Sequence, residues 1–381
     1  MKSPFLPWLP RLPWLPCLAA LAALGLVAPA CGTAAAGGPA SHAAAMPVRL
    51  PHGTPVAHDI RTGPGVTRSL MLSHYHPSLA GTPGDTPVYV FEGKEPGGTL
   101  VIVGGTHENE IAGVFAATVL VETARVNRGR LIVVPRANNS AVTVPDEKRP
   151  APEWVAIRSP SASSSASRRF RFGSRLTNPL HQGAPDPAEL LLPGASKALP
   201  GYEARNLDRA YPGSAEGPLT QRVAFAIVEL LRREKADLAF DLHEAPPASR
   251  LSWMLVSHPR GLDLAAMAVL ELDAAGLAMK LEASDEGFRG LSHREWGDAT
   301  TALSFLVETP NPNQVEGAVG VEPVSHAEYP LASRVAAQLQ TVQAVVSTYS
   351  ASVPPERRIE LAPEPDYRLL GTKGLGEFLL W

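Results

Sequence analysis

Residues 99–121 read TLVIVGGTHENEIAGVFAATVLV. The apolar run at 99–103 has the length and composition of a buried strand, and an apolar pattern with helical spacing begins at 111. Two glycines between them let the chain turn sharply and bring His107 and Glu110 to one side. Ligands of open α/β sheets bind at the carboxyl ends of strands, so a functional site is expected at this turn.

The same alternation of short apolar runs and helical patterns continues along the chain. It predicts an α/β fold in which helices flank a mixed, largely parallel central sheet. The expected strands cover 99–103, 131–134, 238–242, 251–256 and 302–307, and the expected helices cover 111–126, 219–233, 262–275 and 327–349.

The N-terminal segment has the features of a secretory signal. Lys2 and Arg11 precede an apolar run at 17–27, and the sequence Ala-Pro-Ala at 28–30 has the small-x-small form of a cleavage site. Prolines at 4, 7, 10, 13 and 16 interrupt any helix, so the apolar stretch is too short for a membrane span. We therefore expect export to the periplasm or the extracellular space.

Composition divides the chain into further segments. A signal peptide at 1–30 is followed by a flexible tether at 31–55, rich in Ala, Gly and Pro. A single folded domain is expected at 56–350, with a long surface excursion at 141–200 where prolines and a Ser/Ala/Arg-rich run break the alternation. Residues 351–381 are expected to form a tail whose apolar end packs back on the domain.

Both cysteines lie near the N-terminus. Cys17 is inside the expected signal and Cys31 directly follows it, so the folded domain has no thiol for a disulfide. A metal in the domain would then be held by His and carboxylate side chains. Cys31 is either a lipid-modified mature N-terminus, the one membrane attachment expected, or a residue that merely flanks the cleavage site. Ala28 stands where lipidation signals usually have Leu.

The charge of the chain excludes one class of partner. The formal net charge is -3, and the basic residues are dispersed rather than gathered on one segment. Nucleic-acid binders need a concentrated basic surface, so no nucleic-acid partner is expected. Small molecules or peptides are the expected substrates.

Polar residues at the ends of the expected strands indicate a metal site. The apolar strand within 236–245 has His243 at its carboxyl end, with the polar residues Asp241 and Glu244 nearby in the sequence. Together with His107 and Glu110, His243 completes the three His and carboxylate ligands that catalytic zinc commonly has, with water as the fourth. A further strand ends on Glu308, a residue type that strands disfavour and that a site opposite the metal would explain.

Two loops add candidates for substrate binding. Residues 205–213 read RNLDRAYPG, and an arginine fork presented there can hold a carboxylate in two hydrogen bonds. Residues 291–298 read LSHREWGD, which is dense in functional side chains for a loop between helix and strand, and His293 is the first of them to test. The alternative for each segment is an ordinary surface loop.

The order of these motifs resembles the zinc carboxypeptidase superfamily. An H-x-x-E turn, an arginine loop that ends in Y-P-G, a D-L-H strand and a strand that ends in E-T follow one another within about residues 85–345. Within the superfamily, GTHENE and RNLDRAYPG look most like the succinylglutamate desuccinylase/aspartoacylase branch. The resemblance implies a single zinc-carboxypeptidase-like domain.

The resemblance also implies roles for individual residues. It makes His107, Glu110 and His243 the zinc ligands and Glu308 the general base and acid. It makes Arg209 the group that grips a substrate carboxylate.

A second arginine, which polarises the scissile carbonyl, is implied by the same resemblance. Arg205 and Arg175 are both candidates, and Arg136, directly after a strand, is a third. The sequence departs from the family pattern at Asp208, where the family usually has Asn, while Asn206 takes the place of the usual Asp. An anionic Asp208 would weaken the recognition of an acidic substrate, which argues against the classical acylamino-acid substrates of the family.

The expected function is zinc-dependent hydrolysis of an amide bond. The branch resemblance implies a deacylase that acts on an acylated amino acid or a related compound. An exported metallocarboxypeptidase that acts on peptides or murein stem peptides is the second reading, because export argues against a role in cytosolic amino-acid catabolism. The third is an inactive binding protein on the same fold, since fold alone never proves activity.

Overall fold

The computed structural model describes residues 60–146, 152–161, 164–315, 317 and 321–381. The expected export signal and tether, with Cys31, lie outside the described residues. Among the helices of the described part, none is long and apolar enough to cross a membrane.

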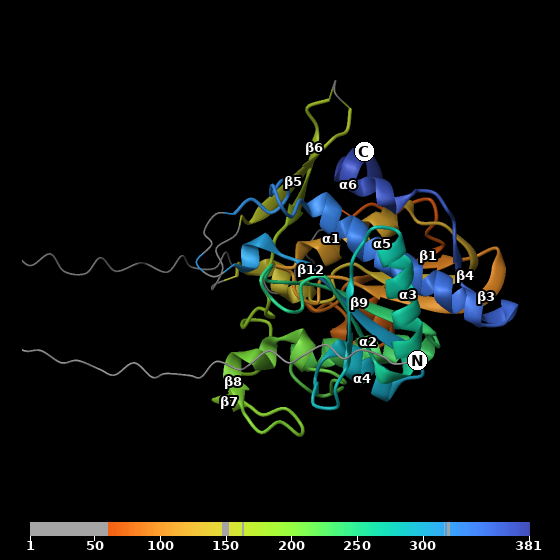
Figure 1. The fold of residues 1–381 in the computed structure, drawn as a ribbon. Coiled ribbons are helices and arrows are strands. Elements are labelled where there is room, and N and C mark those ends of the chain that lie inside the picture. The colour runs from red at the N-terminus through yellow and green to blue at the C-terminus, as the bar shows by residue number, and fades with distance from the viewer. Residues whose placement is uncertain (1–59, 147–151, 162–163, 316, 318–320) are drawn as a thin grey trace, which may run out of the picture. The chain divides into compact units, whose positions relative to one another are not determined.

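A nine-stranded mixed sheet forms the centre of the described domain (Figure 1). Its order is β1-β2-β4-β3-β9-β12-β10-β11, and β13 pairs with β4. The four central strands β4, β3, β9 and β12 run parallel, whereas β2 and β10 join them antiparallel. The predicted α/β architecture is therefore confirmed. The strands are β1 Arg68–Met71, β2 Pro87–Glu92, β3 Glu95–Val103, β4 Val126–Val134, β9 Leu238–Ala245, β10 Met254–Ser257, β11 Lys280–Ala283, β12 Leu303–Pro310 and β13 Glu360–Leu361.

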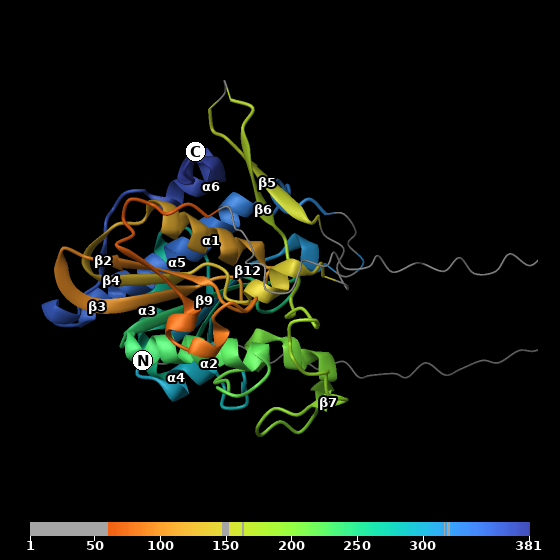
Figure 2. The same cartoon turned by 180° about the vertical axis from the view of Figure 1, so that it is seen from behind.

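Helices cover both faces of the sheet because its central strands are apolar on both faces. In β3, Leu100 and Ile102 pack into one hydrophobic cluster, whereas Val101 and Val103 pack into another. Fully burying a side chain of this size contributes about 1.5–3 kcal/mol, so both layers stabilise the sheet. Figure 2 shows α1 and α5 on one side and α2 and α4 on the other. The helices are α1 Ile111–Thr123, α2 Leu219–Arg233, α3 Leu262–Ala274, α4 Ser292–Ala299, α5 Leu331–Ser352 and α6 Leu370–Lys373.

Strand register brings the expected site residues together at the carboxyl ends of the central strands. Glu308 of β12 is paired with His243 of β9, and β9 is parallel to β3, whose end leads into the turn that carries His107. Gly105 in this turn has φ +67°, which favours glycine. Gly113 lets α1 approach β9 closely, since a Cβ there would lie 2.2 Å from the carbonyl oxygen of Leu242.

Several element boundaries differ from the expected ones for identifiable reasons. Helix α1 ends at Thr123 rather than at 126, because Val126 already begins β4. Helix α5 begins at Leu331, directly after Pro330. The prediction of a loop at 291–298 is wrong. This segment forms the short helix α4, whose Trp296 is buried in the same hydrophobic cluster as residues of α2.

The segment at 141–200 contains structure of its own. Strands β5 (Trp154–Arg158) and β6 (Ser167–Arg171) form a hairpin, and β7 (Glu189–Leu190) pairs with β8 (Leu199–Pro200). Alternate residues of the hairpin join the hydrophobic core, so this part is not wholly a surface excursion. Near the C-terminus, the side chains of Phe378 and Leu379 are buried in the same cluster.

Candidate active site

Three potential metal ligands lie close together at the carboxyl ends of the central strands. Glu110 lies between two imidazoles, with its Oε1 2.9 Å from Nδ1 of His107 and its Oε2 3.0 Å from Nδ1 of His243. The two rings meet edge to face, with their centroids 4.8 Å apart. All three side chains are buried, and one ligand atom from each lies within 4.8 Å of the others.

The second nitrogen of each imidazole has a polar neighbour. Nε2 of His107 lies 2.8 Å from Oδ1 of Asn206, and an amide oxygen can only accept. Nε2 therefore carries the hydrogen, and Nδ1 keeps the lone pair with which it could bind a metal. Nε2 of His243 lies 2.9 Å from Oδ2 of Asp241, whose other oxygen accepts a hydrogen bond from Thr106. A hydrogen-bonded partner such as Asn206 orients the ligating histidine of a metal site.

The electrostatics of the cluster suit a cation. Burial raises the pKa of Glu110, but His107 and His243 outweigh burial and hold that pKa well below its usual range. Burial and the neighbouring Arg175 lower the pKa of His107, so this imidazole is neutral at pH 7. Burial also lowers the pKa of His243, yet Asp241 and Glu110 outweigh it and raise that pKa well above the usual value.

These residues fit a zinc ion. Two imidazoles and a carboxylate are a normal donor set for catalytic zinc. The anionic surroundings that favour a proton on His243 would favour a divalent cation at its Nδ1 in the same way, with release of that proton on binding.

Glu308 presents a buried carboxylate with unused hydrogen-bonding capacity. Its Oε2 is buried and has no hydrogen-bond partner among the described residues. Burial, and then the nearby charge of Glu110, raise the pKa of Glu308 well above its usual value. Glu308 lines a cavity of about 220 Å³ together with the three potential metal ligands.

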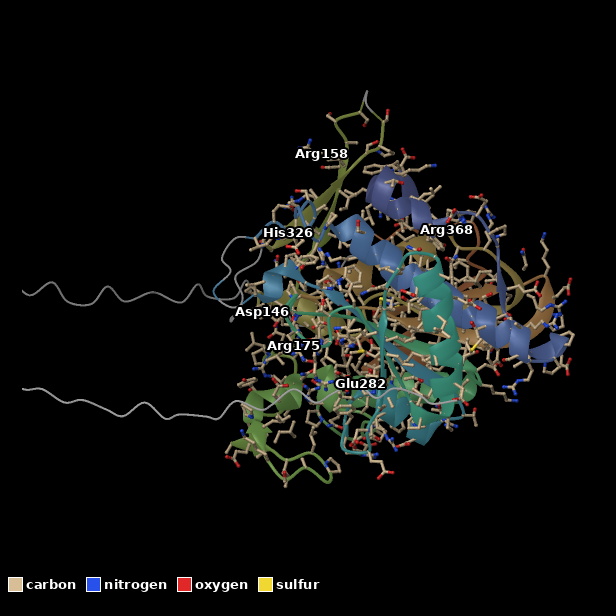
Figure 3. All side chains as sticks on the ribbon, viewed as in Figure 1. Asp146, Arg158, Arg175, Glu282, His326 and Arg368 are labelled. Carbon is tan, nitrogen blue, oxygen red and sulfur yellow. The ribbon has the colours of Figure 1, made fainter. Side chains whose placement is uncertain are left out.

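Of the three arginines that the sequence left open, only Arg175 reaches this cavity. Its Nη1 donates to Oε1 of Glu110 at 3.0 Å and lies 3.1 Å from Nδ1 of His107. Figure 3 shows Arg175 and Glu282, another residue of the cavity wall, in the same region of the molecule.

Arg205 and Arg136 have partners elsewhere. Arg205 lies at the end of a short 3-10 helix (Gly201–Arg205), and its guanidinium bonds Asp186 at 2.9 Å and the carbonyl oxygen of Thr177 at 2.8 Å. Arg136 is buried and pairs with Glu108. The assignment of Arg205 as the carbonyl-polarising group is therefore at odds with the geometry, because these bonds hold the side chain outside the cavity.

The three remaining sequence candidates for substrate binding lie on the cavity wall. Asp208 and Arg209 belong to a 3-10 turn (Leu207–Arg209), and His293 belongs to α4. Nδ1 of His293 lies 2.9 Å from Oγ of Ser284. Burial lowers the pKa of His293 to about 4, so this side chain is a neutral member of the wall at pH 7.

Sequence reasoning missed Gln314 and Arg334. Gln314 follows β12 and donates from Nε2 to Oε1 of Glu110 at 3.0 Å. Arg334 of α5 is fully buried and pairs with Glu244, which also accepts the backbone N–H of Ala112 at 3.0 Å. Glu244 is thereby engaged on both oxygens. A lone glutamine after a strand and an arginine within an apolar helix carry no pattern that would have marked them.

Comparisons with known proteins find similarity only in structure. No family model matches the sequence, and no curated protein does. A succinylglutamate desuccinylase from Silicibacter sp. is similar with 17% identity and a TM-score of 0.41, over 69% of this chain and 60% of that one. A metallo-carboxypeptidase from Burkholderia cenocepacia is similar with 13% identity and a TM-score of 0.44, over 76% and 67%.

A third similar structure is the cell shape determinant protein Csd4 from Helicobacter pylori, with 13% identity and a TM-score of 0.46 over 74% of this chain and 58% of that one. The structural neighbours thus include the two kinds of enzyme whose motif order the sequence resembles. The chain spans about 60% of the length of the desuccinylase structure. All three TM-scores lie below 0.5, so the chemistry of this protein is inferred from its own site residues.

Proposed function

We propose that this protein is a zinc-dependent amide hydrolase of the succinylglutamate desuccinylase/aspartoacylase type. One observation carries the proposal: the unpartnered carboxylate oxygen of Glu308 shares a cavity with the convergent side chains of His107, Glu110 and His243. A metal ligand set beside an unengaged general base is the arrangement that hydrolysis of an amide needs.

The three ligands would hold the ion through Nδ1 of His107, Nδ1 of His243 and the carboxylate of Glu110. Zinc bound there would supply Lewis-acid polarisation of the carbonyl and a lowered pKa for water. Asn206 keeps Nδ1 of His107 available by accepting the hydrogen of Nε2.

Proton transfer falls to Glu308. Its carboxylate takes a proton from the attacking water and returns it to the departing amine, as a single group can when its pKa lies between those of its two partners. Burial raises the pKa of this carboxyl, which favours the return of the proton. Its unpartnered oxygen is free to accept that proton without first breaking a hydrogen bond inside the protein.

Two arginines position the substrate. Arg175 is the described arginine nearest the ligand cluster and would donate to the oxygen of the scissile carbonyl as negative charge develops there. Arg209, farther along the wall, would bind a carboxylate of the substrate. The expected substrate is an acylated amino acid or a related small molecule.

The test is hydrolysis of a substrate panel by the zinc-loaded protein. N-acylated amino acids and short peptides are offered in parallel, and the released product is identified by mass spectrometry. Release of a small acyl acid supports the deacylase. Release of a C-terminal amino acid from peptides would instead support the metallocarboxypeptidase, and no turnover of any amide by zinc-loaded protein would leave a binding protein.

Export is a separate part of the proposal and rests on the N-terminal sequence alone. We propose that the mature protein begins at or near Cys31, in the periplasm or outside the cell. N-terminal sequencing of the protein recovered from each compartment tests this, and an intact Met1 in the cytoplasm would contradict it. Mass measurement of the same sample decides whether Cys31 carries a lipid.

A further inference from the structure

Two opposite charges stand side by side on the cavity wall. Oδ2 of Asp208 lies 3.6 Å from Nη1 of Arg209. Oδ1 of Asp208 accepts the backbone N–H of Ser292 at 2.8 Å, whereas Oδ2 accepts no hydrogen bond from the described residues. Arg209 donates from Nη1 to the carbonyl oxygen of Asp208 at 2.5 Å, and within the described part of the chain its Nε and Nη2 donate no hydrogen bond. Each charge therefore keeps hydrogen-bonding capacity.

A substrate with a carboxylate alone would use only half of this pair. Its carboxylate, held by the guanidinium of Arg209, would lie within a few ångströms of the anionic Asp208 and be repelled by it. Both interactions are strong in a buried site, where water screens charge weakly. A ligand that places an ammonium group beside its carboxylate turns that repulsion into a second attraction.

We propose that Asp208 and Arg209 together recognise the free zwitterionic head of an amino acid, its α-ammonium on Asp208 and its α-carboxylate on Arg209. This rests on the proposed hydrolase function and narrows its substrate class. The α-amino group must be free to bind Asp208, so the amide to be cleaved is formed on the amine of the side chain. Amino acids acylated on the α-nitrogen lack the ammonium and are poor ligands.

The other charged groups of the cavity leave Asp208 as the anion available to an ammonium. Glu282 pairs with Arg250, Glu244 pairs with Arg334, and Glu110 and Glu308 belong to the catalytic cluster. Asp208 also lies near His243, because a carboxylate oxygen of Asp208 and a ring nitrogen of His243 are within 4.8 Å of each other. Its ion pair with Arg209 favours the charged form of the carboxylate.

Apolar residues form another part of the cavity wall. Val256 and Leu306 line the same cavity and belong to one small hydrophobic cluster, against which the cavity residue Leu251 packs. They offer a surface for the aliphatic chain that would join the zwitterionic head to the scissile amide. The cavity of about 220 Å³ has room for a small amino acid ligand.

Binding of small probes to the zinc-loaded mature protein tests the proposal without turnover. Calorimetry compares L- and D-norleucine, which carry both charges, with hexanoate and hexylamine, which carry one each. One norleucine enantiomer should bind about tenfold or more tighter than either single-charge probe, the effect of one added charge-assisted hydrogen bond in a buried site. Asp208→Asn should reduce the preference over hexanoate to about twofold or less and should not weaken hexanoate binding.

The matched control is Asp366→Asn, which removes one negative charge from a residue that pairs with Arg368 and does not line the cavity. Figure 3 shows Arg368 well apart from Arg175 and Glu282 of the cavity wall. The control should leave the preference unchanged. Zinc content and thermal unfolding establish that Asp208→Asn is folded and loaded. Equal binding of norleucine and hexanoate by the wild-type protein would overturn the proposal, and so would an unchanged preference in folded Asp208→Asn.

Turnover separates this inference from the proposed function. Nε-acetyl-lysine is compared with 6-acetamidohexanoate, which differs only by the missing α-ammonium. If the protein binds norleucine selectively but cleaves no amide, the hydrolase proposal fails and the recognition site stands. If the protein cleaves both compounds equally well, the hydrolase proposal is supported, and the proposal that Asp208 and Arg209 recognise a zwitterionic amino acid is refuted.

Discussion

His243 and Glu308 are direct register partners on the adjacent parallel strands β9 and β12. This pairing puts the imidazole of a proposed metal ligand on one strand and, at the same level of the neighbouring strand, a carboxylate whose Oε2 has no hydrogen-bond partner among the described residues. A parallel ladder holds two such residues in a fixed relationship, because its hydrogen bonds are regular along both strands. The proposed base and one proposed ligand therefore owe their proximity to the backbone rather than to a mobile loop.

The zinc content of the purified protein should be about one ion per chain, and His107→Ala or His243→Ala should abolish it, because each removes one of three protein ligands. Atomic emission of the dialysed protein measures this. His326→Ala is the matched control, since that histidine lies away from the cavity and stacks on Tyr329. Normal zinc content in both site variants would refute the assignment.

Removal of zinc should also lower the melting temperature. An ion that binds only the folded state adds stability that depends on its concentration relative to its dissociation constant. A chelator should therefore shift the wild-type melting curve downward and leave His243→Ala unshifted. Identical wild-type curves with and without chelator would argue against a metal in the fold.

Glu308→Gln should retain zinc and lose most turnover. The amide is similar in size to the carboxylate but cannot accept the proton of water, and a general base contributes about 10²- to 10⁴-fold to the rate. The loss should appear in kcat, measured at saturating substrate. A variant that keeps more than about a tenth of the wild-type kcat would fall outside that range and make Glu308 structural.

Arg175→Ala and Arg205→Ala form an informative pair, since both remove a guanidinium but only Arg175 lines the cavity with Glu110. Loss of a donor to the developing oxyanion typically lowers kcat by about 10²- to 10³-fold. Arg175→Ala should show this loss, and Arg205→Ala should not. The reverse result would restore Arg205 as the carbonyl-polarising group.

Arg209→Ala should act mainly on KM. It removes a bidentate anchor for a substrate carboxylate, so the free acid should lose more affinity than its methyl ester. Steady-state kinetics on one such pair measures the difference. If acid and ester suffer equally, Arg209 does not contact that carboxylate.

Asn206→Ala should weaken zinc binding without removing a ligand. His107 loses the acceptor that fixes its ring, and loss of such an outer partner typically costs about 10- to 100-fold in metal affinity. Competition with a fluorescent chelator measures the affinity. Asn206→Asp keeps an acceptor at the same place and should retain tight binding, and equal weakening in both variants would show that the hydrogen bond is not the cause.

Local pattern was sufficient for most of the architecture. The helix expected at 219–233 has the bounds of α2, and the strands that carry the site residues lie where apolar runs predicted them. The failure at 291–298 has a physical cause. A two-turn helix with one buried aromatic residue, Trp296, is too short for a periodic signal to stand out from its charged residues.

The sequence alone determined which chemical groups end the central strands, because apolar runs locate the strands and the residues after them follow directly. His107, Glu110, His243 and Glu308 were predicted in this way, and the structure places all four side chains at one cavity. Only the tertiary structure decided which arginine joins them, since Arg175 and Arg205 come from irregular segments whose path depends on contacts with distant residues. Arg205 hydrogen-bonds Asp186 outside the cavity, whereas Arg175 hydrogen-bonds Glu110 inside it. Neither contact could be predicted from local periodicity, because each joins residues far apart in the sequence.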